Sequence, residues 1–168
     1  MVQFDSVDPY EVIHSMKPLK EVPKLDRNSY VPRSQTPLLD AMGRGINDLE
    51  SHLSKLKEDE RPARVVVAII TDGQENASRE FNKDQIVKMI NERTEKDDWQ
   101  FVFLSSDLSA IQDAGAYGFK RDKSLHFQKT SAGTLSAFAS LSSDLSDYRK
   151  SKKNKMGFQP EPDGKKGK

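Results

Sequence analysis

The distribution of apolar residues predicts one long amphipathic helix in the first half of the chain. From Leu38 to Leu56, apolar side chains recur at spacings of three and four residues, which places them on one face of a helix. Thr36 and Pro37 stand directly before this stripe. Threonine is a common N-cap, and proline suits the first helical position because its missing N–H is not needed there. The pattern therefore predicts a helix that begins at Pro37, is capped by Thr36 and ends near the charged segment before Pro62.

Two later segments are continuously apolar rather than periodic. Residues 64–71 and 99–104 are rich in Val, Ile and Phe, a composition typical of strands buried on both faces of a parallel sheet. A shorter segment, residues 124–127, is expected to form a third strand of this kind. Residues 1–5 are a further strand candidate at the start of the chain.

Helical patterns alternate with these strands. We expect helices at about residues 83–94, 109–117 and 132–148. From residue 37 onward the order is helix, strand, helix, strand, helix, strand, helix, which predicts an α/β fold with a mostly parallel sheet and helices on both faces. The apolar side chains of the last helix that share one face are Leu135, Phe138, Leu141, Leu145 and Tyr148.

Charge divides the chain into an acidic body and a basic C-terminal end. The 168 residues carry a formal net charge of +1, yet the segment from Arg149 to Lys168 contains eight Lys and Arg against two acidic residues. It is rich in Gly and Pro, so burial cannot offset the entropy lost on ordering it. We predict one domain over residues 1–148 and a disordered, solubilising tail over 149–168. Contact of the tail with nucleic-acid phosphates is the alternative, while the acidic body argues against a broad nucleic-acid surface.

The absence of cysteine and of long apolar runs excludes several classes of protein. The sequence contains no Cys, so it is not a disulfide scaffold and has no thiolate metal site or cysteine nucleophile. Its longest apolar run, Val65 to Ile70, is far shorter than the roughly 20 residues of a membrane span. The first residues do not resemble a secretion signal. We therefore expect a cytoplasmic protein without membrane contact.

Candidate chemistry lies where the predicted strands end, because ligands of open parallel sheets bind beyond the carboxyl ends of the strands. Asp72 directly follows the strand at 64–71, and Thr36 precedes the long helix. A carboxylate and a hydroxyl are both suitable ligands for a hard divalent cation. The alternative is structural: Asp72 caps the following turn and Thr36 caps its helix.

The segments around these two residues resemble the von Willebrand factor A (vWA) domain, in its stand-alone bacterial and phage form. The resemblance rests on Tyr30-Val-Pro-Arg-Ser-Gln-Thr36-Pro-Leu-Leu-Asp40 and on Val65-Val-Val-Ala-Ile-Ile-Thr-Asp72-Gly-Gln-Glu75-Asn76. It implies a three-layer Rossmann-like fold and a metal-ion-dependent adhesion site. That site uses an Asp-x-Ser-x-Ser loop, a later Thr and a later Asp. Motif matching gives Thr36 the Thr role and Asp72 the last Asp role.

The resemblance also implies that the first strand of the family, its helix and the Asp-x-Ser-x-Ser loop are missing, and Ser34 stands where the family usually has Gly. Three explanations stay open: residues 1–5 pair directly with residues 65–71, another chain supplies the strand, or the sequence is an incomplete gene product. A divalent cation takes about six oxygen ligands. Thr36 and Asp72 supply too few, so Mg²⁺ binding by this chain alone is expected to be weak or absent. Ser34, Ser105 and Asp107 are near the same edge but match no ligand position.

Three functions follow as hypotheses. The first is a non-enzymatic protein–protein interaction module with a partial metal-ion-dependent adhesion site, as the resemblance implies. The second is a truncated or regulatory vWA fragment that pairs with another chain, as a homo-oligomer or through a donated strand. The third is a metal-dependent phosphoryl-transfer enzyme or hydrolase that uses Asp72. The sequence favours the first, because it has neither a recognisable Ser-His-Asp arrangement nor a phosphate-binding glycine loop.

Overall fold

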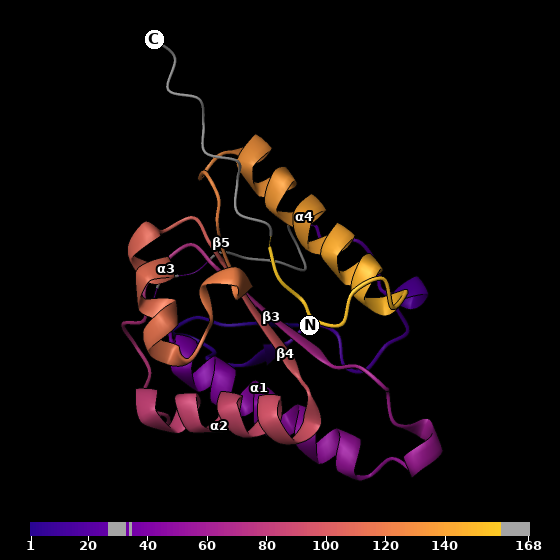
Figure 1. Ribbon diagram of the computed structural model, residues 1–168. Helices are drawn as coiled ribbons and strands as arrows, with labels where there is room; N and C mark the ends of the chain where they lie inside the picture. The colour runs from indigo at the N-terminus through magenta and orange to yellow at the C-terminus, as the bar shows by residue number, and fades with distance from the viewer. Residues whose placement is uncertain (27–32, 34, 159–168) are drawn as a thin grey trace. The chain divides into compact units, whose positions relative to one another are not determined.

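The computed structural model describes residues 1–26, 33 and 35–158, which fall into two units (Figure 1). Unit 1 comprises Met1–Pro62 and Gln74–Met89, and unit 2 comprises Ala63–Gly73 and Ile90–Lys168. The chain therefore leaves unit 1 before the first long strand and returns to it directly after that strand.

The N-terminal residues of unit 1 form their own antiparallel ribbon. Strand β1 (Val2–Gln3) pairs with β2 (Glu11–Val12), with Val2 opposite Val12. Direct pairing of residues 1–5 with residues 65–71 was one of the three explanations for the missing strand. It is not the arrangement observed, because β1 pairs with β2 and the later strand pairs elsewhere.

The predicted long helix is confirmed as α1 (Leu38–Ser54), and it buries Leu38, Met42 and Ile46. Its start differs from the prediction. Pro37 is the N-cap residue, and the helix start has no side-chain cap from this position or from Thr36. The expected Thr36 cap is therefore wrong, because residues distant in sequence satisfy the first N–H groups of the helix. A 3₁₀ turn (Glu58–Glu60) follows, and α2 (Lys83–Asp97) begins in unit 1.

Unit 2 contains the predicted parallel sheet. Its strands are β3 (Val66–Thr71), β4 (Gln100–Ser105) and β5 (Ser124–His126), in the order β3-β4-β5. Val66 lies opposite Gln100, and Phe103 lies opposite Ser124. Every residue of β4 is buried, as expected for the central strand of a parallel sheet.

The two faces of this sheet carry separate clusters. On one face Val102 and Leu104 pack with Ala137 and Leu141 of α4 (Ser131–Arg149). Neighbouring residues of a strand point to opposite faces. Phe103 accordingly lies on the other face, where its ring centroid is 5.2 Å from that of Phe119. The short helix α3 (Leu108–Ala114) follows β4.

Helix α4 is present where a helix was predicted, but it buries a different set of residues. Leu141 and Tyr148 are buried, together with Ala137, whereas Leu135 is 71% exposed and Phe138 is 48% exposed. The helix face that packs against β4 is therefore not the face that carries Leu135 and Phe138.

The chain beyond α4 continues to pack against unit 2. The Met156 side chain is buried in the same cluster as Leu104 and Tyr148. Lys123 Nζ donates to Gln100 Oε1 at 2.6 Å and to the Met156 carbonyl oxygen. The packed part of unit 2 thus extends to Phe158, beyond the boundary predicted at residue 149. The remainder of the predicted tail, residues 159–168, lies outside the described residues.

The described chain is therefore a mixed α/β protein with a three-stranded parallel sheet and a small antiparallel ribbon. Within residues 1–26 and 35–158, no helix combines the length and apolar character required to cross a bilayer.

Candidate functional site

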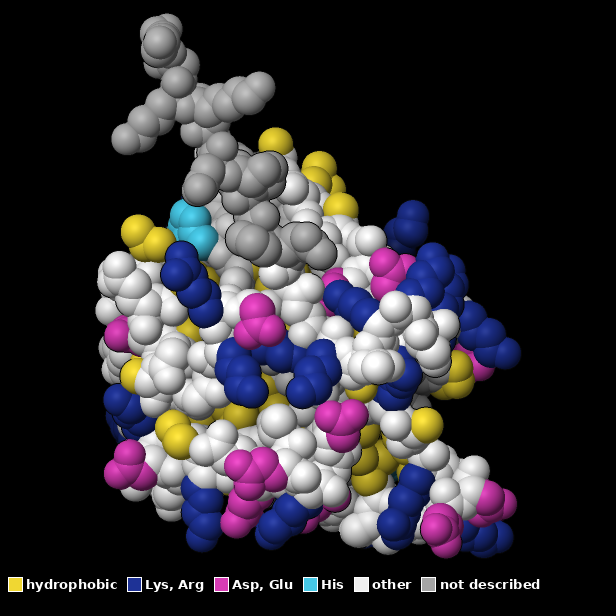
Figure 2. Space-filling model, viewed as in Figure 1, with side chains coloured by type: hydrophobic (Ala, Val, Ile, Leu, Met, Phe, Trp, Pro, Cys, Tyr) yellow, Lys and Arg dark blue, Asp and Glu magenta, His cyan; other side chains and the backbone are white. Residues whose placement is uncertain are grey.

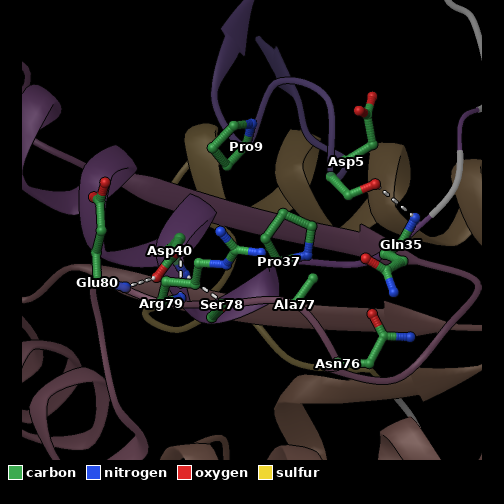
Figure 3. A pocket seen from close by; sticks show the side chains of 11 residues that line it. Asp5, Pro9, Gln35, Pro37, Asp40, Asn76, Ala77, Ser78, Arg79 and Glu80 are labelled. Atoms are coloured by element: carbon green, nitrogen blue, oxygen red, sulfur yellow. Dashed lines mark hydrogen bonds between the residues drawn. The ribbon is translucent and has the colours of Figure 1, made fainter.

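In unit 1, the loop of residues 74–81 contacts the start of α1 and forms a pocket of about 510 Å³ with the N-terminal segment (Figure 3). The pocket is lined mainly by polar side chains from three parts of the sequence. They are Asp5, Ser6 and Pro9; Gln35, Pro37 and Asp40; and Asn76, Ala77, Ser78, Arg79 and Glu80.

The 74–81 loop supplies the caps of α1. The first N–H groups of a helix have no partner inside the helix. Glu75 Oε2 accepts the Leu39 N–H at 2.9 Å, and Ser78 Oγ accepts the Asp40 N–H at 3.1 Å. Glu75 Oε1 also accepts the N–H of Ala77, at 2.9 Å. Glu75 therefore caps the helix and also fixes the conformation of its own loop.

Asp40 binds the loop in the opposite direction. Its side chain accepts the backbone N–H groups of Arg79, Glu80 and Phe81 at 2.8–2.9 Å. Asp40 is only 3% exposed. Burial opposes its ionisation, but the three N–H donors outweigh that effect and hold the pKa of Asp40 below its ordinary value. Arg44 and Glu80 add an ion pair beside it.

Thr36 is held at the edge of this arrangement by its backbone. Its N–H donates to Asn76 Oδ1 at 2.8 Å, and its carbonyl oxygen accepts the Asn76 N–H at 3.2 Å. Within the described parts of unit 1, no hydrogen bond is made by the Thr36 hydroxyl group. The hydroxyl therefore does not cap α1. The two hydrogen bonds with Asn76 fix the backbone of Thr36.

Asp72 lies in unit 2, immediately after β3. Its side chain is 73% exposed and forms an ion pair with Lys129, with 3.1 Å between Oδ2 and Nζ. The turn after β3 is closed by Thr71 instead, because Thr71 Oγ1 accepts the Gly73 N–H at 3.2 Å and donates to the Gly73 carbonyl oxygen at 3.0 Å. The structural alternative for Asp72, a turn cap, is therefore not observed.

The other residues considered near the strand ends have structural roles or cannot be described. Ser105 Oγ accepts the Asp107 N–H at 3.0 Å. Asp107 is the N-cap of α3 and accepts the N–H groups of Ser109 and Ala110 at 2.8 Å and 3.1 Å. Ser34 lies outside the described residues.

The two predicted ligands belong to different units, Thr36 to unit 1 and Asp72 to unit 2. Nowhere in the described part of the chain do three or more His, Cys, Asp or Glu side chains gather in a group able to hold a metal ion. A cation site would therefore need hydroxyl, water or partner oxygens in addition to any carboxylate.

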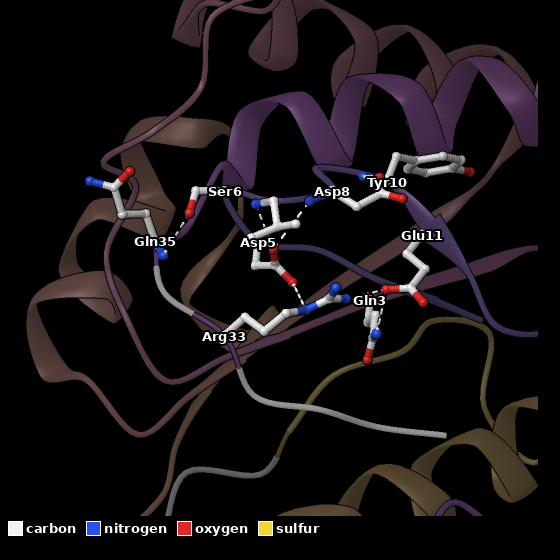
Figure 4. Close-up of polar contacts among 9 residues, drawn as sticks. Gln3, Asp5, Ser6, Asp8, Tyr10, Glu11, Arg33 and Gln35 are labelled. Carbon is white, nitrogen blue, oxygen red and sulfur yellow. Dashed lines mark hydrogen bonds and ion pairs between the residues drawn. The ribbon is translucent and has the colours of Figure 1, made fainter. Parts of the chain in front are cut away.

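A second polar cluster in unit 1 was not predicted (Figure 4). The Asp5 side chain is 6% exposed and accepts the Val7 N–H at 2.7 Å, while Arg33 Nε lies 2.7 Å from its other oxygen. Arg33 also pairs with Glu11. Hydrogen bonds from Gln3 and Arg33 lower the pKa of Glu11. The sequence signal for the turn is the Asp5-Ser-Val-Asp8 segment, since Asp commonly accepts the N–H two residues on. The Arg33 contact carries no such local signal.

No protein-family model matches the chain, and no curated protein or solved structure matches it significantly. The relation to the vWA domain thus stays a resemblance in two sequence segments.

Proposed function

We propose that this protein is a non-enzymatic protein–protein interaction module of the vWA type, with a three-layer Rossmann-like fold and a partial metal-ion-dependent adhesion site at Thr36 and Asp72. One observation supports the proposal most directly. Thr36 does not cap α1, because Glu75 and Ser78 accept the first N–H groups of the helix. Asp72 does not cap the turn after β3, because Thr71 accepts the Gly73 N–H.

The chemistry of the two side chains fits a hard cation. Mg²⁺ prefers oxygen ligands in octahedral geometry and is commonly bound through one or two carboxylates together with water. Asp72 contributes an exposed carboxylate, and Thr36 contributes a hydroxyl on a backbone fixed by Asn76. An acidic side chain of a partner protein would complete the coordination. Binding of this kind needs neither a nucleophile nor a general base.

The acidic residues of the unit 1 pocket support binding rather than catalysis. Asp40 accepts hydrogen bonds from three backbone N–H groups. Asp5 is paired with Arg33 and accepts two N–H groups of its own turn. The N–H donors hold the pKa of Asp40 below its ordinary value, so Asp40 lacks the raised pKa expected of a general acid. The carboxylate of Asp5 is occupied by Arg33 and by its own turn.

The proposal is tested by titrating the protein with Mn²⁺, a paramagnetic substitute for Mg²⁺, and following free Mn²⁺ by electron paramagnetic resonance. We expect weak binding whose dissociation constant rises about tenfold or more in Thr36→Val and in Asp72→Asn, because each substitution removes an oxygen ligand. Asp113→Asn is the matched control, because Asp113 is an exposed acid of α3. Equal binding by all four proteins would refute the assignment of the two ligands.

A further variant, Asp72→Ala, separates binding from the hydrolase hypothesis. Asp72 follows a parallel strand and has a cationic neighbour, Lys129, an arrangement that also suits a phosphate ester. Metal-dependent hydrolysis of p-nitrophenyl phosphate by the wild type that is lost in Asp72→Ala would favour the enzyme. We expect no such turnover.

A further inference from the structure

Strand β3 is an edge strand of the sheet in unit 2. It pairs with β4 and with no other strand among the residues that the structure describes. The carbonyl oxygen of Val65 accepts the Gln100 N–H at 2.9 Å, so the backbone groups of Val65 face β4. Because these groups alternate along a strand, those of Val66, Ala68 and Ile70 face away from β4. In the described chain, none of these outward groups has a hydrogen-bond partner.

The residues of this edge are not of the kinds that protect edge strands from pairing. Natural edges carry Lys, Pro, bulges or inward charges that prevent association. From Val65 to Ile70 the strand contains only Val, Ala and Ile. Ala68, at the centre of β3, is exposed. The strand therefore presents open backbone groups without a charge to repel a second strand.

We propose that β3 pairs antiparallel with β3 of a second copy of this chain, across a two-fold axis at Ala68. A two-fold contact is isologous, so each residue meets its symmetric counterpart. This register places Val66 opposite Ile70 of the second copy and Ala68 opposite Ala68. It joins the two sheets into one of six strands, three from each copy. Antiparallel strands at the edge of a parallel sheet are common.

Charge complementarity favours this register over its neighbours. With the axis at Ala68, Arg64 of one copy lies opposite Asp72 of the other, and the pair occurs at both ends of the contact. Arg64 is held in place by Tyr148, whose ring centroid lies 4.3 Å from its Cζ, and by a hydrogen bond to Ser151 Oγ at 3.3 Å. Moving the axis by one residue removes both opposite-charge pairs.

The proposed pairing fixes which face of the joined sheet carries the α4 helices. Opposed residues in an antiparallel pair point to the same face, and Val66 and Ile70 pack on the α4 side of the sheet. Both α4 helices consequently cover the same face of the joined sheet. Leu135 and Phe138 remain largely exposed on α4, and Figure 2 shows hydrophobic side chains at the surface over this helix.

A single introduced cysteine tests the register directly, because the chain has no Cys of its own. Residues that exchange both backbone hydrogen bonds have Cα atoms about 5.5 Å apart, within the range that a disulfide spans. We expect Ala68→Cys to convert on mild oxidation to a covalent dimer of twice the 19.0 kDa chain mass. Ala139→Cys, at an exposed alanine of α4, is the control and should crosslink far less. The experiment is performed in EDTA, so that cation binding at Asp72 does not affect it.

Sedimentation equilibrium of the unmodified protein provides the second measurement. We expect a reversible dimer whose dissociation constant rises about tenfold or more in Ala68→Lys, because two like charges then lie directly opposite each other. Ala139→Lys should dimerise as the wild type does, and circular dichroism establishes that each variant is folded. A wild type that stays monomeric at all concentrations, or equal crosslinking at residues 68 and 139, would overturn the proposal. Neither result bears on Mn²⁺ binding, so the two proposals fail independently.

Discussion

Asp40 illustrates how one buried carboxylate organises the loop beside the candidate site. It accepts N–H groups from three consecutive loop residues, and its own N–H donates to Ser78. The oxygens of its carboxylate are thus occupied by the chain itself. The position of the loop relative to Thr36 depends on these contacts, since Asn76 belongs to the same loop.

Replacement of Asp40 by asparagine should lower the free energy of unfolding by about 2 kcal/mol or more, because hydrogen bonds to a charged group are worth more than neutral ones. Asp59→Asn, at an exposed acid of the same unit, should have little effect. The comparison requires urea denaturation of the three proteins at neutral pH. An Asp40→Asn protein as stable as the wild type would contradict the role given to this carboxylate.

The stability should also depend on pH through Asp40. Its pKa is lower in the folded state than the ordinary value, so the stabilisation is complete above the unfolded-state pKa of about 4. It is lost as the pH falls through the folded-state pKa. Between pH 5 and about 3 the wild type should therefore lose more stability than Asp40→Asn. Parallel pH profiles of the two proteins would be evidence against this linkage.

At the scale of elements, the packing of α1 against the 74–81 loop depends on a glycine. A Cβ atom added at Gly43 would lie 2.5 Å from ring atoms of Phe81, closer than any real contact. At Gly45, two residues further along the helix, an added Cβ would have its nearest atom in Tyr10, at 3.7 Å. The two glycines of the same helix thus differ in their surroundings.

Gly43→Ala should destabilise the protein by about 1–3 kcal/mol, because Phe81 must move to accept the methyl group. Gly45→Ala is the matched control and should be neutral or stabilising, since alanine is the better helix former by about 1 kcal/mol. Thermal denaturation of both variants provides the measurement. The same stability change in both would show that Phe81 does not constrain this helix.

The sequence predicted the elements better than their contacts. The spacing of apolar residues is sufficient for α1, and continuous apolar runs are sufficient for β3 and β4. The cap of α1 was not predictable from Thr36, because Glu75 lies 36 residues from its partner Leu39. For α4 the pattern favoured Phe138, whereas the sheet accepts Ala137. For the candidate site, the motif match proposed Thr36 and Asp72. The structure was needed to show that Glu75 caps α1 and that Thr71 closes the turn after β3.

At the scale of the whole chain, the segment after α4 is part of the folded unit. Met156 is 1% exposed, and its N–H and carbonyl groups bind Gln100 and Lys123. Burial lowers the pKa of Lys123. Removal of the segment would leave this buried ammonium group with one fewer acceptor, in addition to exposing the apolar cluster.

Truncation after Arg149 should therefore lower the melting temperature by about 5 °C or more, because the burial of a side chain such as Met156 is worth about 1.5–3 kcal/mol. Truncation after Phe158 removes none of the described contacts and should leave the melting temperature unchanged. Differential scanning calorimetry distinguishes the two. Equal melting temperatures of both truncated proteins would mean that residues 150–158 do not stabilise unit 2.

The central proposal is that Thr36 and Asp72 are ligands of one cation. The most direct measurement is a crystal structure of the protein grown with Mn²⁺, with anomalous differences recorded to locate the ion. The account predicts an anomalous peak within coordination distance of both the Thr36 hydroxyl and the Asp72 carboxylate. Crystals in which these two groups lie too far apart to share an ion would contradict it.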